Sequence, residues 1–94
     1  MVPNGDSSHG PFADLSPRDR AILQQAQQQG RVLDPLTSAR IEEVVREHPQ
    51  TPEFTDEAYE VAIISELRLK VPPLLLPHPD DVGLFLARWR AARP

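Results

Sequence analysis

The sequence predicts an all-α protein, a small bundle of about four short helices. Its 94 residues suffice for one small domain. A capping residue followed by proline, which is a clear helix-start signal, occurs at 16–17, 34–35 and 78–79. Residues 55–71 lie in the longest segment without proline or glycine and predict the remaining helix. We therefore expect a single helical domain over residues 16–94.

Residues 1–15 are predicted to form a flexible, disordered tail. They combine glycine, proline, serine and asparagine with scattered apolar residues, so they bury too little surface to offset the entropy of ordering. Phe12 and Leu15 are candidates for fixing the end of the tail to the core. We find neither a signal peptide nor an apolar run of roughly 20 residues, and we expect a cytoplasmic protein without membrane association.

The first helix is predicted to begin after Ser16, which caps it, with Pro17 at the first helical position. Asp19 stands three residues after the cap and is expected to complete a variant of the capping box. Gly30 ends the helix. The glutamine-rich stretch 24–29 is interpreted as a solvated face, with a glutamine-mediated interaction surface as the alternative.

The second helix is predicted to begin at Asp34-Pro35 and to run to about His48, before Pro49. It is an ordinary amphipathic helix. His48 is interpreted as a half-buried structural residue at the helix C-terminus, with a proton switch as the alternative. The face toward the core is expected to carry Thr37, Ile41, Val44, Val45 and His48.

The helix over residues 55–71 is apolar on more than one side, so we expect it to occupy the centre of the bundle. Thr51 and Thr55 are alternative caps for it. Residues 65–71 alternate between polar and apolar, which is also typical of a strand. We favour helix to about Leu69. One face would carry Tyr59, Ile63, Ile64, Leu67 and Val71, and other sides Ala58, Val61, Ala62 and Leu69.

Residues 72–79 are predicted to cross the bundle as an extended, polyproline-like segment, because prolines interrupt them four times. The last helix then begins at His78-Pro79, with Asp80 and Asp81 in its first turn. Gly83 within it suggests the close approach of another backbone. Its packing face is expected to carry Val82, Phe85, Leu86 and Trp89.

The charge pattern disfavours nucleic acid as the partner. The net charge is −4, and the range from Ile41 to Glu66 contains eight acidic residues against one basic residue. An acidic centre repels a phosphate backbone. The alternative is a transcription-associated, antitoxin-like regulator that contacts DNA through a basic C-terminal helix with Arg88, Arg90 and Arg93.

The segment His78-Pro79-Asp80-Asp81 resembles the HPDD(E) zinc motif of the LmbE/PIG-L-type deacetylases. The resemblance covers these four residues, and Val82 stands where that motif has an acid. It implies that His78 and Asp81 would be metal ligands and Asp80 a general base, as in a metal-dependent hydrolase. An N-terminal helix cap accounts for the same residues, and we predict that the segment is a cap.

Outside this segment, we find no residues arranged for catalysis. The three histidines are dispersed, there is no phosphate-binding glycine loop, and Ser38 and Ser65 have no supporting motif. There is no cysteine, which excludes disulfides and thiolate metal sites. We therefore expect a protein that is not an enzyme and that has neither a cofactor nor a metal.

The leucines at 74–76 are the best candidates for an interaction surface. Three consecutive leucines in an extended segment point in different directions, so they cannot all enter one core, and Leu84 lies off the packing face of the last helix. Clustered exposed apolar residues mark interaction sites. We predict a small protein–protein interaction module, either a homodimer or an accessory subunit, that uses Leu74, Leu75, Leu76 and Leu84. The alternative is that the segment covers the bundle and buries two leucines.

Overall fold

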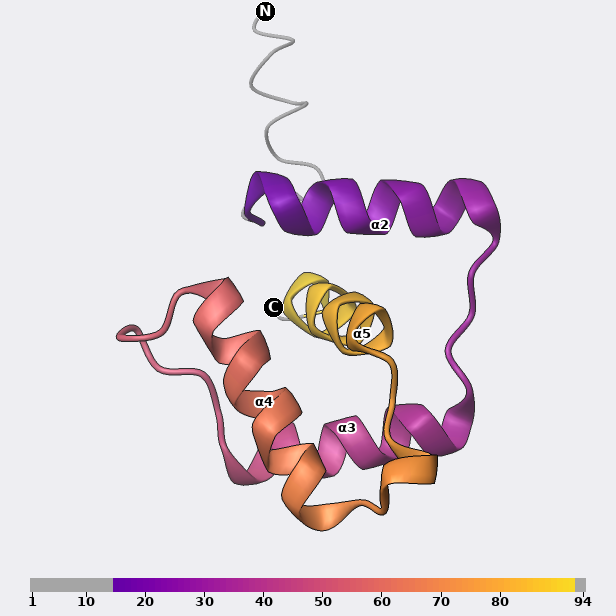
Figure 1. Ribbon diagram of the computed structural model, residues 1–94. Helices are drawn as coiled ribbons and strands as arrows, with labels where there is room; N and C mark the ends of the chain where they lie inside the picture. The colour runs from indigo at the N-terminus through magenta and orange to yellow at the C-terminus, as the bar shows by residue number, and fades with distance from the viewer. Residues whose placement is uncertain (1–14, 93–94) are drawn as a thin grey trace, which may run out of the picture.

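The computed structural model describes residues 15–92, which form an all-α fold with no strand in this range (Figure 1). The predicted fold class is therefore confirmed. The predicted tail lies outside the described residues apart from Leu15, which packs against the core as expected. The elements are α2 (Pro17–Gln29), α3 (Pro35–Glu47), α4 (Asp56–Lys70), the 3-10 turn η1 (Pro73–Leu75) and α5 (Pro79–Ala91).

Each of the four α-helices within residues 15–92 begins at a side-chain cap. The hydroxyl of Ser16 accepts a hydrogen bond from the backbone N–H of Asp19 at 3.1 Å, and Asp34 and Thr55 cap α3 and α4 in the same way. At α5, Nδ1 of His78 accepts from the N–H of Asp80 at 3.1 Å. These bonds satisfy N–H groups that have no partner within their own helix. The three proline-containing start signals are thus confirmed, and Thr55 caps α4.

The centre of the bundle is α5. The six consecutive residues from 82 to 87 are all buried, and six consecutive helical positions point in every direction around the axis. Helix α5 must therefore be enclosed on all sides, and it contacts α2, α3 and α4. Figure 1 shows α5 nearly end-on between the other three helices.

The expectation that α4 occupies the centre is wrong. Its inner face packs on α3 and α5 through Tyr59, Ile63 and Leu67, which are buried. On the opposite side Val61 and Leu69 are 63% and 81% exposed. The second apolar side of α4 is real, but no described residue covers it. The end of α4 at Lys70 confirms the helical interpretation of residues 67–70 over the strand.

The segment between α4 and α5 is not extended throughout. Residues Pro73–Leu75 form the 3-10 turn η1, in which the N–H of Leu75 donates to the carbonyl of Pro72 at 2.9 Å. A proline φ near −65° is compatible with such a turn as well as with polyproline, so the prolines alone do not distinguish the two. After η1, Leu76 returns to extended backbone and packs against the core.

A buried ion pair connects the first turn of α2 to the last turn of α5. Nη1 of Arg90 donates to both carboxylate oxygens of Asp19, at 3.1 and 2.9 Å. The Asp19 side chain is 1% exposed and that of Arg90 is 11% exposed. Nε of Arg90 also contacts Gln50 at 3.2 Å and Asp56 at 3.4 Å. The predicted capping-box role of Asp19 is therefore corrected, because its carboxylate binds Arg90.

Candidate functional site

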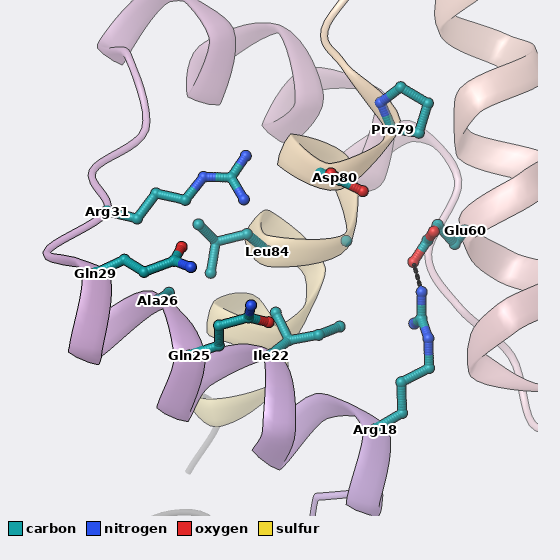
Figure 2. A pocket seen from close by; sticks show the side chains of 11 residues that line it. Arg18, Ile22, Gln25, Ala26, Gln29, Arg31, Glu60, Pro79, Asp80 and Leu84 are labelled. Carbon is teal, nitrogen blue, oxygen red and sulfur yellow. Dashed lines mark hydrogen bonds and ion pairs between the residues drawn. The ribbon is translucent and has the colours of Figure 1, made fainter.

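A polar cavity of about 390 Å³ lies between α2, α4 and α5. Figure 2 shows Arg18 and Glu60 at one end, Arg31 at the other, and Gln25 and Gln29 along the α2 wall. The sequence did not predict this cavity, because its wall residues come from three helices far apart in the chain. The glutamines are exposed, as the solvated-face interpretation expects.

The charges in this cavity neutralise one another. Nη2 of Arg18 donates to Oε1 of Glu60 at 2.9 Å, and Arg31 forms an ion pair with Asp81. Burial by itself would lower the pKa of Arg18, but the hydrogen bond and charge of Glu60, together with the charges of Glu57 and Asp19, outweigh it, and the pKa is raised. The lining residues include no histidine, serine or threonine that would act as a nucleophile or base. The carboxylates of Glu60 and Asp80 also line the cavity, and both of its arginines are ion-paired.

Gly83 lies at this cavity, and its role differs from the one expected. A Cβ built at Gly83 would meet Oε1 of Glu60 at 3.2 Å. The close neighbour is therefore a side-chain carboxylate and not another backbone. Glycine here gives space to the Arg18–Glu60 pair between α2 and α4.

The HPDD segment serves as a helix start. His78 caps α5, its Nδ1 lies 3.7 Å from a carboxylate oxygen of Asp80, and Asp81 is paired with Arg31. Among residues 15–92, no three histidine, cysteine or acidic side chains are grouped as a metal ion would need. The cap predicted for this segment is confirmed. At the C-terminal end of α3, Nε2 of His48 lies 3.5 Å from Oε2 of Glu66.

The three arginines of the DNA-binding alternative do not form a common surface in the described part of the chain. Arg90 is mostly covered and paired with the buried Asp19, and Nη2 of Arg88 donates to the carbonyl of Arg31 at 2.8 Å. Arg93 lies outside the described residues. A phosphate backbone would have to break the buried pair to reach Arg90.

The four leucines predicted to form one interaction surface are separated by the fold. Leu74 and Leu75 are 98% and 50% exposed on η1, whereas Leu76 is partly buried against the core. Leu84 is 1% exposed, because α5 is enclosed on every side. This part of the prediction is corrected. Only Leu74 and Leu75 remain available at the surface.

A more regular apolar surface lies on the outer face of α4, which we define as Ala58, Val61, Ala62, Ser65 and Leu69. The positions 58, 62, 65 and 69 follow intervals of four, three and four, and such intervals align residues along one side of a helix. Ala62 is half-buried and the other four residues are exposed. The hydroxyl of Ser65 donates to the carbonyl of Val61 at 3.0 Å, so it would not lose a partner if the face were covered.

Opposite charges stand at the two ends of the outer face. Glu57 lies beside its first turn and Arg68 beside its last turn, and both are exposed. Eleven residues make about three helical turns, so Glu57 and Arg68 lie on the same flank of α4. Glu57 acts on the charge of Arg18 at longer range, but neither Glu57 nor Arg68 forms an ion pair with a described residue.

The sequence contained the signal for this surface. Four residues, Ala58, Val61, Ala62 and Leu69, are recognisable as apolar residues off the main face of the helix. A central position of this helix predicts that they are buried, and the structure places them on its outer side.

None of the helices within residues 15–92 is long and apolar enough to cross a membrane. Comparison with protein-family models, with curated proteins and with solved structures found no significant match.

Proposed function

We propose that the protein is a small, non-catalytic helical module that binds another polypeptide through the outer face of α4. The observation that carries this proposal is the regular row of exposed apolar and small residues opposite the packed face of the same helix. A helix with one side on the core and the other side in water normally has a single apolar stripe, which faces the core. Helix α4 has a second apolar stripe on the side that faces water. The cytoplasmic location expected from the sequence stays a prediction.

The chemistry of the outer face fits docking better than catalysis. Fully burying an exposed valine or leucine side chain contributes about 1.5–3 kcal/mol. Val61 and Leu69, at 63% and 81% exposed, have most of that burial still to gain from a partner. Their burial would leave no new donor unpaired at Ser65, whose hydroxyl is already bonded. The arginines of the polar cavity, by contrast, are ion-paired, and its lining includes no histidine, serine or threonine.

Site-specific photo-crosslinking tests the proposal. Benzoylphenylalanine at Val61 is expected to give a discrete adduct with a polypeptide, and introducing Leu69→Asp in the same chain is expected to abolish that adduct. The matched control places the crosslinker at Val32, which is also highly exposed but lies between α2 and α3. Equal labelling at both positions, or no adduct at Val61 in purified protein and in cell extract, would contradict the proposal.

The same variants separate binding from folding. Val61→Asp changes a position that is exposed in the single chain, so its free energy of unfolding should change by less than about 0.5 kcal/mol. Urea denaturation followed by far-UV circular dichroism measures this change. A loss of several kcal/mol would mean that the outer face already packs within the chain.

A further inference from the structure

We infer that the partner of this face is a second copy of the chain, bound with its α4 antiparallel to the first. The inference rests on the proposed function. It is carried by the charge arrangement on α4, which is complementary to itself. The first turn of the helix is acidic, with Asp56 and Glu57, and the last turn is basic, with Arg68 and Lys70.

A two-fold axis uses this arrangement twice. In an antiparallel pair of identical helices, the same flank of each helix faces the other copy. Glu57 and Arg68 share a flank, so Glu57 of each copy lies near Arg68 of the other. A two-fold interface is self-complementary in this way: if one residue contacts another across it, the reverse contact also forms.

The apolar row obeys the same symmetry. With the axis midway between Ala62 and Ser65, each of these small residues faces the other across the interface, and Ala58 faces Leu69. Small side chains at the middle permit close approach of the two helices, and the leucine at each end packs over an alanine. The intervals 58, 62, 65 and 69 read the same from either end.

A parallel arrangement conflicts with the charges. It would place the two acidic first turns together and the two basic last turns together, and like charges are destabilising at such distances. It would also align the two helix dipoles in the same direction. Three turns of one helix form a small contact area, so we expect a weak, concentration-dependent dimer of the size class below about 1,200 Å².

Disulfide trapping tests the antiparallel register directly, because the chain has no cysteine of its own. Ala58→Cys and Leu69→Cys chains are mixed and oxidised. The mixed pair should crosslink, because these positions face each other. Each variant alone should crosslink far less, because its two thiols would lie about 16 Å apart along the helix axis. Efficient crosslinking of Ala58→Cys alone would overturn the antiparallel register.

Charge reversal provides an independent test. Glu57→Arg and Arg68→Glu should each raise the dimer Kd by about threefold to tenfold, and the double reversal should restore it toward the wild-type value. Arg20→Glu, an exposed change on α2, is the control and should leave the Kd unchanged apart from the general effect of net charge. Two single reversals whose effects simply add in the double variant would overturn the pairing.

The two proposals fail in different ways. If the purified chain stays monomeric at concentrations up to about 1 mM, its dimer Kd is too weak for a functional interaction, and the second copy is excluded as the partner. If Val61 in that case still crosslinks one other polypeptide and Val32 does not, the docking function stands with a different occupant. If Val61 crosslinks nothing, both proposals are overturned.

Discussion

Replacing Arg90 with alanine should destabilise the fold more than any other arginine substitution among the described residues. The change removes the counter-ion of Asp19, a carboxylate whose side chain is only 1% exposed. A carboxylate without water or a counter-ion in a buried site is strongly unfavourable. Removing one member of a buried pair typically costs about 3–5 kcal/mol.

The structure refines this magnitude. Asp19 lies in the first turn of α2, where the helix dipole favours a negative charge. The hydroxyl of Ser16, however, accepts a hydrogen bond from the backbone N–H of Asp19 and does not contact its carboxylate. Arg90→Ala also removes contacts to Gln50 and Asp56. We therefore expect about 4 kcal/mol. A domain of this size has a total stability of about 4–12 kcal/mol, so the variant should lose a third of it or more.

Urea denaturation followed by far-UV circular dichroism and by the fluorescence of Trp89 measures the effect. Arg88→Ala is the matched control: it changes the same residue type in the same helix turn, but Arg88 is exposed and makes one hydrogen bond to the carbonyl of Arg31. It should cost no more than about 1 kcal/mol. An Arg90→Ala cost as small as that of Arg88→Ala would refute the reasoning.

A double variant separates the ion pair from general packing. Asp19→Leu combined with Arg90→Met replaces both charges with apolar groups of related shape. Such replacements are often neutral or stabilising, so the double variant should be more stable than Arg90→Ala by at least about 2 kcal/mol. If the double variant is the less stable of the two, the loss in Arg90→Ala does not arise from the buried charge.

Three further results are expected. Gly83→Ala should stabilise α5 by about 0.5 kcal/mol in urea denaturation, because the gain in helix propensity exceeds the small displacement of Glu60; a loss above about 1 kcal/mol would contradict this. Ser16→Ala should cost about 1 kcal/mol by thermal melting, and no change would show that the cap is not needed. The hydrogen bond from Lys70 lowers the pKa of Glu47 from 4.5, so the small stabilisation by this pair, present at neutral pH, should disappear as the pH falls through the lowered value. The hydrogen bond to Glu47 raises the pKa of Lys70 above its ordinary value of 10.5, so the stabilisation should also be lost as the pH rises through the raised pKa; a stability difference between wild type and Lys70→Met that does not change with pH would contradict both expectations.

Helix boundaries were predictable because their chemistry is local. Ser16, Asp34 and His78 each bond an N–H two or three residues ahead, and that geometry depends on the neighbouring sequence alone. The end of α4 at Lys70 is predictable for the same reason, because the proline at position 72 prevents the helix from continuing.

The identity of the central helix was not predictable in the same way. Both α4 and α5 carry apolar residues on more than one side, and periodicity does not tell which of two such helices the others surround. The position of Leu84 off the main face of α5 predicts an exposed residue, yet α5 is enclosed and Leu84 is buried. Conversely, a central α4 predicts that Val61 is buried, and it is exposed. The packing of whole helices decides these positions.

Long-range polar pairs left no local signal. Asp19 and Arg90 are 71 residues apart, and each has a plausible local role, as a capping-box acid and as a cation at a helix C-terminus. The same holds for Arg18 and Glu60 at the cavity, 42 residues apart. Only the arrangement of helices brings the partners together.

Sedimentation equilibrium tests the central claim, that the outer face of α4 is the contact surface between two copies of the chain, most directly. Wild-type protein and Val61→Asp are compared from about 10 µM to about 1 mM, a range that covers weak dimers. The wild-type weight-average mass should rise from that of one chain toward that of two, and Val61→Asp should remain at one. An equal rise in both proteins would place the contact on another surface and contradict the account.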